Sequence, residues 1–180
     1  MGKIVVLTGS PRKGGNSFAM TDAFIRAAEE KGHTVTRFDV AMMHVGGCRA
    51  CNGCFKTGKA CCVEDDFNGM APAILEADGI LLSMPVYWYT MPAQIKGAID
   101  RLYSFFVAGK EIGGKKCALI TCCEESDETV MDGVRIPYER SAALLQWQNV
   151  GEVLVPGVLN VGDVDKTDGC ARAAVLADLF

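Results

Sequence analysis

Cysteine is the residue type in this 180-residue chain that points most directly to chemistry. There are nine cysteines, and five of them fall within one short stretch, at Cys48, Cys51, Cys54, Cys61 and Cys62. A Cys-x2-Cys-x2-Cys run is a spacing that [4Fe–4S] clusters use, because one short loop can wrap three irons, whereas a zinc site more often has two separated Cys-x2-Cys pairs. The spacing therefore ranks iron above zinc, with structural or redox-active thiols as the alternative.

A second group of candidate residues follows the first apolar run, in the segment GSPRKGGNS at residues 9–17. A loop rich in Gly and hydroxyl side chains that opens a helix directs backbone N–H groups and the positive end of the helix dipole at an anion. The segment lacks the Lys-Ser/Thr of a Walker loop and the second glycine of a dinucleotide fingerprint. Its polar groups suit a terminal phosphate monoester; they belong to Ser10, Arg12, Asn16 and Ser17. The alternative is an ordinary helix start capped by Asn16 or Ser17.

Aromatic side chains form a third group, in the segment PVYWYTMP at residues 85–92. Three adjacent aromatic residues cannot all face a core from one turn, so at least one should line an edge of the fold. An aromatic wall stiffened by proline suits a flat ring system, which stacks on such faces. The alternative places Tyr87 and Trp88 in the core or in a subunit interface.

The elements that must position these groups alternate along the chain. Apolar runs of strand length recur at Ile4–Leu7, Val35–Val40, Gly79–Met84, Cys117–Thr121 and Val153–Leu159. Helical patterns occur at Met20–Ala28, Phe67–Ala77, Ile95–Phe106, Tyr138–Gln148 and Asp168–Leu179. This rhythm predicts an α/β fold built of βαβ units around a parallel sheet. The irregular segments Ala41–Asp65 and Glu124–Pro137 both follow predicted strands, so we expect both at the carboxyl edge of the sheet, where doubly wound folds bind ligands.

The composition fits a single domain spanning residues 1–180. Hydrophobic residues make up 49% and charged residues 22%, which excludes a disordered chain. The formal net charge is −4, and without a basic excess we expect no nucleic-acid partner. No apolar run approaches the roughly 20 residues that a membrane-spanning helix needs, and no secretory signal precedes the first strand. We therefore expect no membrane partner and a cytoplasmic location.

Three segments together resemble a known family. They are GSPRKGGNS at residues 9–17, PVYWYTMPAQIKGAIDR at residues 85–101, and the cysteine stretch that ends in Glu64-Asp65-Asp66. These segments resemble the flavodoxin-like NAD(P)H-dependent FMN oxidoreductases, especially those related to iron-sulfur flavoproteins, and the similarity extends to about residue 162. The resemblance implies a doubly wound, five-stranded parallel sheet in the order 2-1-3-4-5, with FMN at the switch point of the sheet.

The resemblance also assigns roles to individual residues. The FMN phosphate would be held by Ser10, Arg12, Asn16 and Ser17, and the isoalloxazine would be bordered by Pro85, Val86, Tyr87 and Trp88. Thr121 would lie near the pyrimidine side of the flavin, although Cys122-Cys123-Glu124 stands where family members often have Gly. The ligands of a [4Fe–4S] cluster would be Cys48, Cys51, Cys54 and Cys61, with Cys62 competing for the fourth position. Such a cluster would lie on the flavin edge of the sheet, close enough for electron exchange with this flavin or with one in a neighbouring subunit.

The function implied by the resemblance is an FMN-dependent oxidoreductase. NAD(P)H, as co-substrate, would deliver hydride to the flavin, which would pass electrons to a quinone, free flavin, metal ion, iron-sulfur centre or redox protein. No catalytic side chain is predicted, because the cofactor itself carries this chemistry. The alternatives are an FMN electron carrier without nicotinamide turnover and a module that binds phosphorylated metabolites. We also expect a homo-oligomer, a dimer or tetramer, because the exposed aromatic residues need cover.

Overall fold

The computed structural model describes residues 1–180 and contains one sheet of five parallel strands. The strands are β1 (Lys3–Thr8), β2 (Thr34–Asp39), β3 (Gly79–Pro85), β4 (Lys116–Cys122) and β5 (Gln148–Val155). Their order in the sheet is β2-β1-β3-β4-β5, which confirms the predicted flavodoxin-like topology. The chain changes direction across the sheet after β2, so the carboxyl ends of β1 and β3 flank the switch point at which such folds bind ligands.

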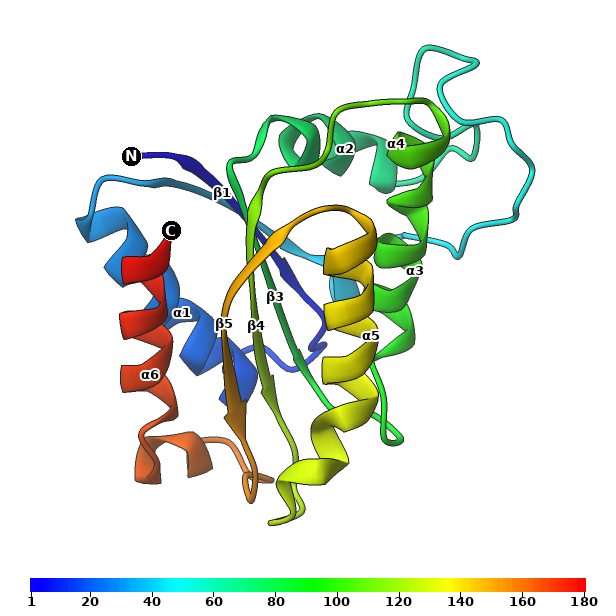
Figure 1. Ribbon diagram of the computed structural model, residues 1–180. Helices are drawn as coiled ribbons and strands as arrows, with labels where there is room; N and C mark the ends of the chain where they lie inside the picture. Colours follow the sequence, from blue (N-terminus) through cyan, green and yellow to red (C-terminus); the bar gives the residue numbers. More distant parts are fainter.

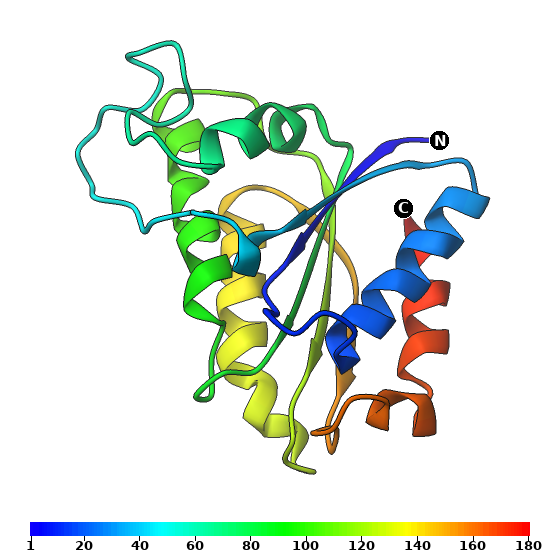
Figure 2. The ribbon, with the colours of Figure 1, turned by 180° about the vertical axis from the view of Figure 1, so that it is seen from behind.

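Helices cover both faces of the sheet (Figures 1 and 2). One face carries α1 (Asn16–Glu30) and α6 (Gly169–Leu176). The other carries α2 (Phe67–Glu76), α3 (Ala93–Arg101), α4 (Tyr103–Val107) and α5 (Asp132–Leu144). Four short 3-10 helices complete the chain, namely η1 (Val40–Met42), η2 (Glu128–Met131), η3 (Asp163–Lys166) and η4 (Ala177–Leu179). None of the helices has the length and apolar character needed to cross a membrane.

The central strands are apolar at nearly every position because helices bury both of their faces. Successive side chains of β1 point to opposite faces, so Val5 and Leu7 join the core cluster on the side of α2, α3 and α5. Ile4 and Val6 join the second cluster, on the side of α1 and α6. The two apolar layers hold the sheet rigid between them, and the strand ends can therefore position a site.

Helix α5 begins earlier than the sequence predicts, at Asp132 rather than Tyr138, and it continues through Pro137. A proline inside a helix has no amide for the carbonyl four residues earlier, which here belongs to Gly133. The hydroxyl of Thr90 donates to that carbonyl over 2.9 Å and so replaces the missing hydrogen bond. The proline therefore does not end the helix, because a residue from a distant loop supplies the donor.

Two other boundaries differ from the predicted ones. Strand β5 covers Gln148–Val155 rather than Val153–Leu159, because it is an edge strand whose first residues are polar and partly exposed. The helix predicted over Ile95–Phe106 is divided at Leu102 into α3 and α4. The earlier end of β5 frees residues 156–162 to form a loop at the carboxyl edge.

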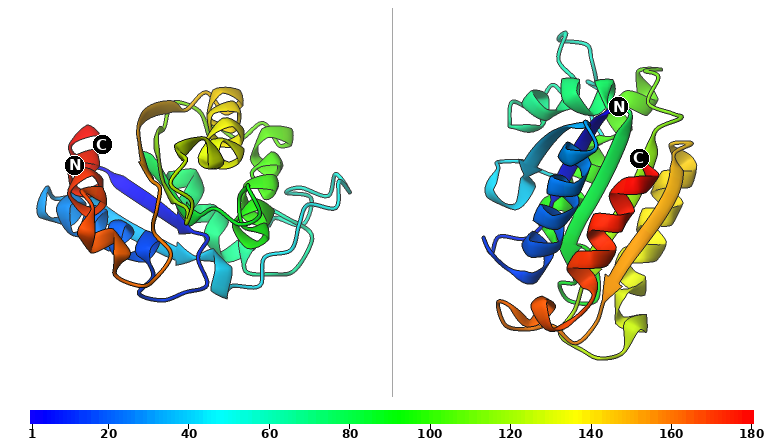
Figure 3. Two further views of the ribbon diagram at one scale, coloured as in Figure 1. Left: turned by 90° about the horizontal axis from the view of Figure 1, so that it is seen from below. Right: turned by 90° about the vertical axis from the view of Figure 1, so that its left-hand side faces the viewer.

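The cysteine-rich segment after β2 does not stay at the carboxyl edge of the sheet. Figures 1, 2 and 3 show it leaving η1, passing α3 and reaching the opposite end of the molecule beside α2 and α4. The carbonyl of Val45 lies against Gly97 of α3, where an added Cβ would be 3.2 Å from it, and the rings of Phe55 and Phe105 in α4 are 5.9 Å apart. The prediction that this segment lies on the flavin edge is therefore wrong. The segment is long enough to pass a whole helix, and its anchors lie on α3 and α4.

Candidate functional site

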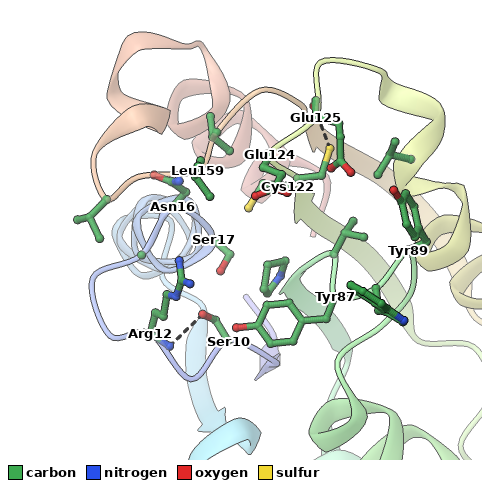
Figure 4. Close-up of a pocket in the computed structure, with 18 residues that line it drawn as sticks. Ser10, Arg12, Asn16, Ser17, Tyr87, Tyr89, Cys122, Glu124, Glu125 and Leu159 are labelled. Carbon is green, nitrogen blue, oxygen red and sulfur yellow. Dashed lines mark hydrogen bonds between the residues drawn. The ribbon is translucent and has the colours of Figure 1, made fainter.

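A cavity of about 530 Å³ lies at the carboxyl edge of the sheet, where the loops after four strands meet (Figure 4). The loop after β1 and the start of α1 contribute Ser10, Arg12, Gly15, Asn16 and Ser17. The end of β3 and the turn after it contribute Pro85, Val86, Tyr87, Trp88 and Tyr89. The remaining lining residues are Cys122, Cys123, Glu124, Glu125, Val130, Val158, Leu159 and Val161. The cavity therefore brings together the two loops that the sequence singled out.

One end of the cavity is formed by the amino terminus of α1. Gly15 precedes the helix in an extended conformation and no side chain caps it. The first helical amide with a backbone partner is that of Ala19, which donates to the Gly15 carbonyl, so the three amides before it have none. No acidic side chain occupies the first turn, and the Arg12 guanidinium lies nearby. N–H groups without backbone acceptors, the helix dipole and a cation make this end suited to an anion.

The side chain of Asn16, predicted to contact the phosphate, is hydrogen-bonded to the segment that follows β5. Its Nδ2 donates to the Asn160 carbonyl over 3.0 Å, and its Oδ1 accepts from the Val164 amide over 3.2 Å. Both ends of the amide group are thus engaged with the segment that follows β5. Asn16 therefore ties the anion end of the cavity to that segment, and only Ser10, Arg12 and Ser17 keep polar side chains directed at the cavity from this loop (Figure 4).

The aromatic wall of the cavity is a strained turn. Tyr87 and Thr90 exchange two backbone hydrogen bonds, of 2.9 and 3.1 Å, and the two residues between them both have positive φ angles, 51° for Trp88 and 63° for Tyr89. Such a turn favours Gly or Asn at these positions, so two aromatic residues there are costly and point to a functional constraint. Trp88 is 94% exposed in this turn, although it is one of the residues that line the cavity.

Helix α5 holds this turn in place. Gly133 lies so close to Tyr89 that any Cβ added to it would overlap the Tyr89 carbonyl oxygen. Beside it, the Thr90 hydroxyl donates to the Gly133 carbonyl, as described above. The phenol of Tyr87 points across the cavity toward Ser10 (Figure 4). The turn and the start of α5 therefore form one rigid unit that presents the Tyr87 ring to the cavity.

Two cysteines at the end of β4 line the cavity between the anion end and the aromatic wall. The Cys122 thiol points into it (Figure 4) and is only 4% exposed. Burial raises the pKa of Cys122 to about 12, with a further contribution from Cys123, whereas the backbone N–H of Ser17 opposes the rise. Burial also raises the pKa of Cys123, whose thiol donates to the Glu125 carbonyl over 3.3 Å. Both thiols are therefore neutral at physiological pH.

Thr121, predicted to lie beside the flavin, is outside the cavity lining. It is fully buried and its hydroxyl has no hydrogen-bond partner. Its neighbour Cys122 occupies the cavity instead, because successive residues of a strand face opposite sides of the sheet. The predicted strand end does reach the cavity, but the residue of β4 that lines it is Cys122.

The loop after β5 contributes lining residues that the sequence analysis assigned to a strand. Val158 donates from its amide to the Cys123 carbonyl over 2.9 Å, and Gly157 donates to the Glu125 carbonyl over 2.8 Å. These bonds join the loops after β4 and β5 into one wall. The signal that could have located this loop is the Pro156-Gly157 pair, which marks a turn.

The four predicted cluster ligands are not brought to one point. Cys61 is buried, with its sulfur accepting from the Val63 amide at 3.4 Å, whereas Cys48 and Cys51 are exposed. Nowhere in the chain do three or more His, Cys, Asp or Glu side chains converge as metal ligands. The thiols therefore do not form an assembled four-ligand site in this arrangement, and the [4Fe–4S] cluster stays a prediction from the sequence. The cysteine loop also contributes no residue to the cavity lining.

The cysteine loop is fixed to the body of the molecule by a buried ion pair. The guanidinium of Arg101, 2% exposed, forms two hydrogen bonds of 2.8 and 3.1 Å to the Asp65 carboxylate and a third of 3.0 Å to the Gly46 carbonyl. Its Cζ also lies 5.1 Å from the centre of the Phe67 ring. The two ends of the loop are therefore joined to the last residue of α3.

Comparison with known sequences identifies the family. A family model described as NADPH-dependent FMN reductase matches residues 2–132, which include the anion loop, the aromatic turn and the end of β4. The chain belongs to this family. The match to the FMN reductase family does not include the loop after β5 and helix α6.

The relatives of this family member include iron-sulfur flavoproteins. One from Archaeoglobus fulgidus is 33% identical over 103 residues, which cover 57% of this chain and 46% of the relative. Another, from Methanosarcina thermophila, is 34% identical over 99 residues, covering 55% of this chain and 51% of the relative. The chain therefore spans about half the length of these curated relatives. Among solved structures, azoreductase AzrA superposes with a TM-score of 0.76 at 21% identity, covering 99% of this chain and 100% of that one, and this likeness supports the fold.

Proposed function

We propose that this member of the NADPH-dependent FMN reductase family is an FMN-dependent oxidoreductase, with FMN bound in the cavity at the carboxyl edge. NAD(P)H would reduce the flavin, which would pass its electrons to a small-molecule acceptor or a redox protein. The observation that carries the proposal is a single cavity with an uncapped helix amino terminus at one end and an aromatic wall at the other. A phosphate and a flat ring in one ligand match these two ends.

The proposed phosphate position is the amino terminus of α1. Its unpartnered amides, the hydroxyls of Ser10 and Ser17, and the Arg12 guanidinium would donate to the phosphate oxygens. Asn16 would act indirectly, because it holds the segment after β5 against this end.

The proposed ring position lies between the Tyr87 wall and the end of β4. FMN, when bound, supplies the capacity to accept hydride and release electrons. The protein would supply orientation: Tyr87 offers an aromatic face, and the neutral Cys122 thiol offers a small polarizable contact without a charge. Glu124 and Glu125 lie at this end and Arg12 lies at the other, so the cavity has a negatively charged end and a positively charged end. A ligand with an anionic tail is thereby oriented with its tail toward α1.

The decisive experiment is reconstitution with FMN followed by anaerobic mixing with NADPH or NADH. We expect a bound flavin spectrum and rapid bleaching of its visible absorption by one of the two nucleotides. A bound flavin that neither nucleotide bleaches would instead identify an electron carrier. Protein that stays colourless after reconstitution would overturn both functions and leave a module for other phosphorylated ligands.

The anion end can be tested separately with Arg12→Glu. Arg12 is exposed and lines the cavity, so reversing its charge leaves the core unchanged but replaces an attraction to the phosphate by a repulsion. We expect the Kd for FMN to rise by about 10- to 100-fold, which corresponds to about 1.4–2.8 kcal/mol, and the Kd for riboflavin, which lacks the phosphate, to change little. Lys13→Glu makes the same change of charge at the neighbouring exposed residue, which does not line the cavity, and is the matched control. Equal losses for both ligands would contradict the assignment of the phosphate to α1.

The cytoplasmic location, the homo-oligomer and the single-domain extent of residues 1–180 stay predictions from the sequence. Size-exclusion chromatography with light scattering would test the oligomer, and a monomeric mass at micromolar concentration would contradict it.

A further inference from the structure

We propose that Cys51 and Cys62 form a redox-active dithiol pair that closes to a disulfide when the protein meets a low-molecular-weight disulfide. Their sulfur atoms are 3.4 Å apart, although the residues are eleven positions apart in the chain. Both side chains are exposed, so an oxidant can reach them. Their proximity replaces the four-cysteine arrangement that the sequence predicts, and it lies at the opposite end of the molecule from the cavity.

Cys62 is held by a clamp on its two neighbours. The side chain of Asn68, in the first turn of α2, accepts from the Cys61 amide over 2.8 Å and donates to the carbonyls of Cys61 and Val63, each over 3.0 Å. The backbone on both sides of Cys62 is therefore fixed to a helix. Because Asn68 holds the flanking residues by their main-chain atoms, the Cys62 side chain is left free to face Cys51.

Cys51 is held by an unusual backbone conformation. Its neighbours Ala50 and Asn52 have φ angles of 51° and 53°, a left-handed conformation that costs energy for a residue with a side chain. The next residue, Gly53, approaches Cys62 so closely that an added Cβ would lie 2.5 Å from the Cys62 sulfur and 3.6 Å from that of Cys51. Position 53 therefore requires glycine, because any side chain there would overlap the Cys62 sulfur where the two segments of the loop approach each other.

None of the other three thiols of the loop is both exposed and in contact with a second thiol. The Cys48 sulfur accepts from the Ala50 amide at 3.5 Å, and the Cys61 sulfur is buried and accepts from the Val63 amide at 3.4 Å. Cys54 is only partly exposed. Of the five cysteines in the segment, the structure therefore selects one pair that is both exposed and in contact.

The chemistry is thiol–disulfide exchange and is balanced by the oxidant. The thiolate of one cysteine attacks a small disulfide RSSR, forms a mixed disulfide and releases RS⁻. The second cysteine then attacks the mixed disulfide, forms the Cys51–Cys62 bond and releases the second RS⁻. The pair gives up two electrons and two protons, and RSSR becomes two RSH. The sulfurs need approach only from 3.4 Å to about 2.05 Å, within a segment that has no helix or strand.

The test oxidises the purified protein with oxidised glutathione, alkylates the free thiols and digests the product with trypsin. Cleavage after Arg49, Lys56 and Lys59 places Cys51 on the peptide 50–56 and Cys62 on the peptide 60–96. We expect these two peptides to be linked, the link to be released by dithiothreitol, and the intact mass before alkylation to fall by two hydrogens.

Single variants identify the sulfurs, because each of the two peptides contains a second cysteine. We expect the link to be lost in Cys51→Ser and in Cys62→Ser and kept in the matched controls Cys54→Ser and Cys61→Ser. If Cys61→Ser does not fold, fragmentation of the linked wild-type peptides locates the bond. FMN binding by Cys62→Ser should equal that of the wild type, so this test stands apart from the proposed function.

Two results would overturn the proposal. One is a link that persists in Cys62→Ser and disappears in Cys61→Ser. The other is anaerobically purified protein that holds stoichiometric iron and acid-labile sulfide, with the iron lost in Cys51→Ser and kept in Cys62→Ser. That pattern would make Cys51 a cluster ligand and Cys62 a bystander.

Discussion

The cysteines of this protein occupy two contrasting environments. Cys122 and Cys123 end a central strand, are about 95% buried and face the cavity. The thiols of the loop between η1 and α2 are mostly exposed, and their positions are set by turns and by contacts to α3 and α4. The first pair has no freedom to change partners, whereas Cys51 and Cys62 can form a covalent bond with little movement.

The difference shows which residues a parallel sheet places and which it does not. Residues at strand ends share one edge whatever their sequence separation, so the cavity gathers groups from the ends of β1, β3, β4 and β5. A long loop that leaves the same edge is not bound to stay there. Its destination depends on which of its side chains find partners, and here these partners are Arg101 and Phe105 at the far end.

The largest effect that would separate the two regions is expected from Asp65→Asn. This change keeps the shape of Asp65 but leaves the buried Arg101 guanidinium without its counter-charge, so we expect the free energy of unfolding to fall by about 3 kcal/mol. Urea titration at neutral pH measures it. Glu64→Gln, which breaks the exposed Lys59–Glu64 pair in the same loop, is the matched control and should cost less than about 1 kcal/mol. A loss of FMN affinity as large as the loss of stability would contradict the separation of loop and cavity.

An intermediate effect is expected from the buried thiol of Cys122 at alkaline pH. Its pKa is about 12 in the folded protein and about 8.5 in an unfolded chain, so the folded state keeps a proton that the unfolded state loses above pH 8.5. The unfolded state then binds fewer protons, and stability falls as pH rises, by at most about 1.4 kcal/mol per pH unit from this group. We expect Cys122→Ala to have a shallower loss of stability between about pH 9 and 10.5.

The control for this comparison is Cys48→Ala, which removes an exposed thiol of the loop and should keep the wild-type slope. Urea titrations at several pH values measure all three proteins. Identical slopes for the wild type and Cys122→Ala would show that the thiol is not shielded as the structure describes.

The smallest effect is expected from Thr90→Val. It removes the donor that satisfies the Gly133 carbonyl beside Pro137, at an exposed position, so we expect a loss of about 1 kcal/mol in the free energy of unfolding. Thr90→Ser keeps the hydroxyl and should be nearly neutral. Pro137→Ala restores a helical amide at the same carbonyl, so Thr90→Val should cost less in that background. A full cost in the double variant would show that the hydroxyl acts through another partner.

The sequence predicted most of what positions the cavity. Its two loop motifs, at residues 9–17 and 85–92, do line it, and the strand order agrees with that of the resembling family. These features could be predicted because they depend on local signals: glycines before a helix and consecutive aromatic residues after a buried strand. Which residue at the end of β4 faces the cavity could not be predicted. No local sequence pattern distinguishes the last residue that packs in the core from the first that lines the cavity.

The course of the cysteine loop could not be predicted from the sequence for a different reason. Its contacts with the body of the molecule join residues far apart in the chain, such as Asp65 to Arg101 and Phe55 to Phe105. No periodic pattern in the sequence predicts such contacts. The same holds for the pairing of Cys51 with Cys62, which depends on Asn68 and on the close approach of Gly53. Spacing alone favours the regular Cys-x2-Cys-x2-Cys run.

The strand order has a consequence for a chain cut within residues 48–62. β1 pairs with β3 and α1 packs on α6, so the piece before the cut would stay attached to the piece after it along one strand pair and one helix pair. The anion end of the cavity would belong to the first piece and the aromatic wall to the second. Each piece alone would hold half of the binding site. A bound ligand would contact both pieces and would therefore stabilise their association.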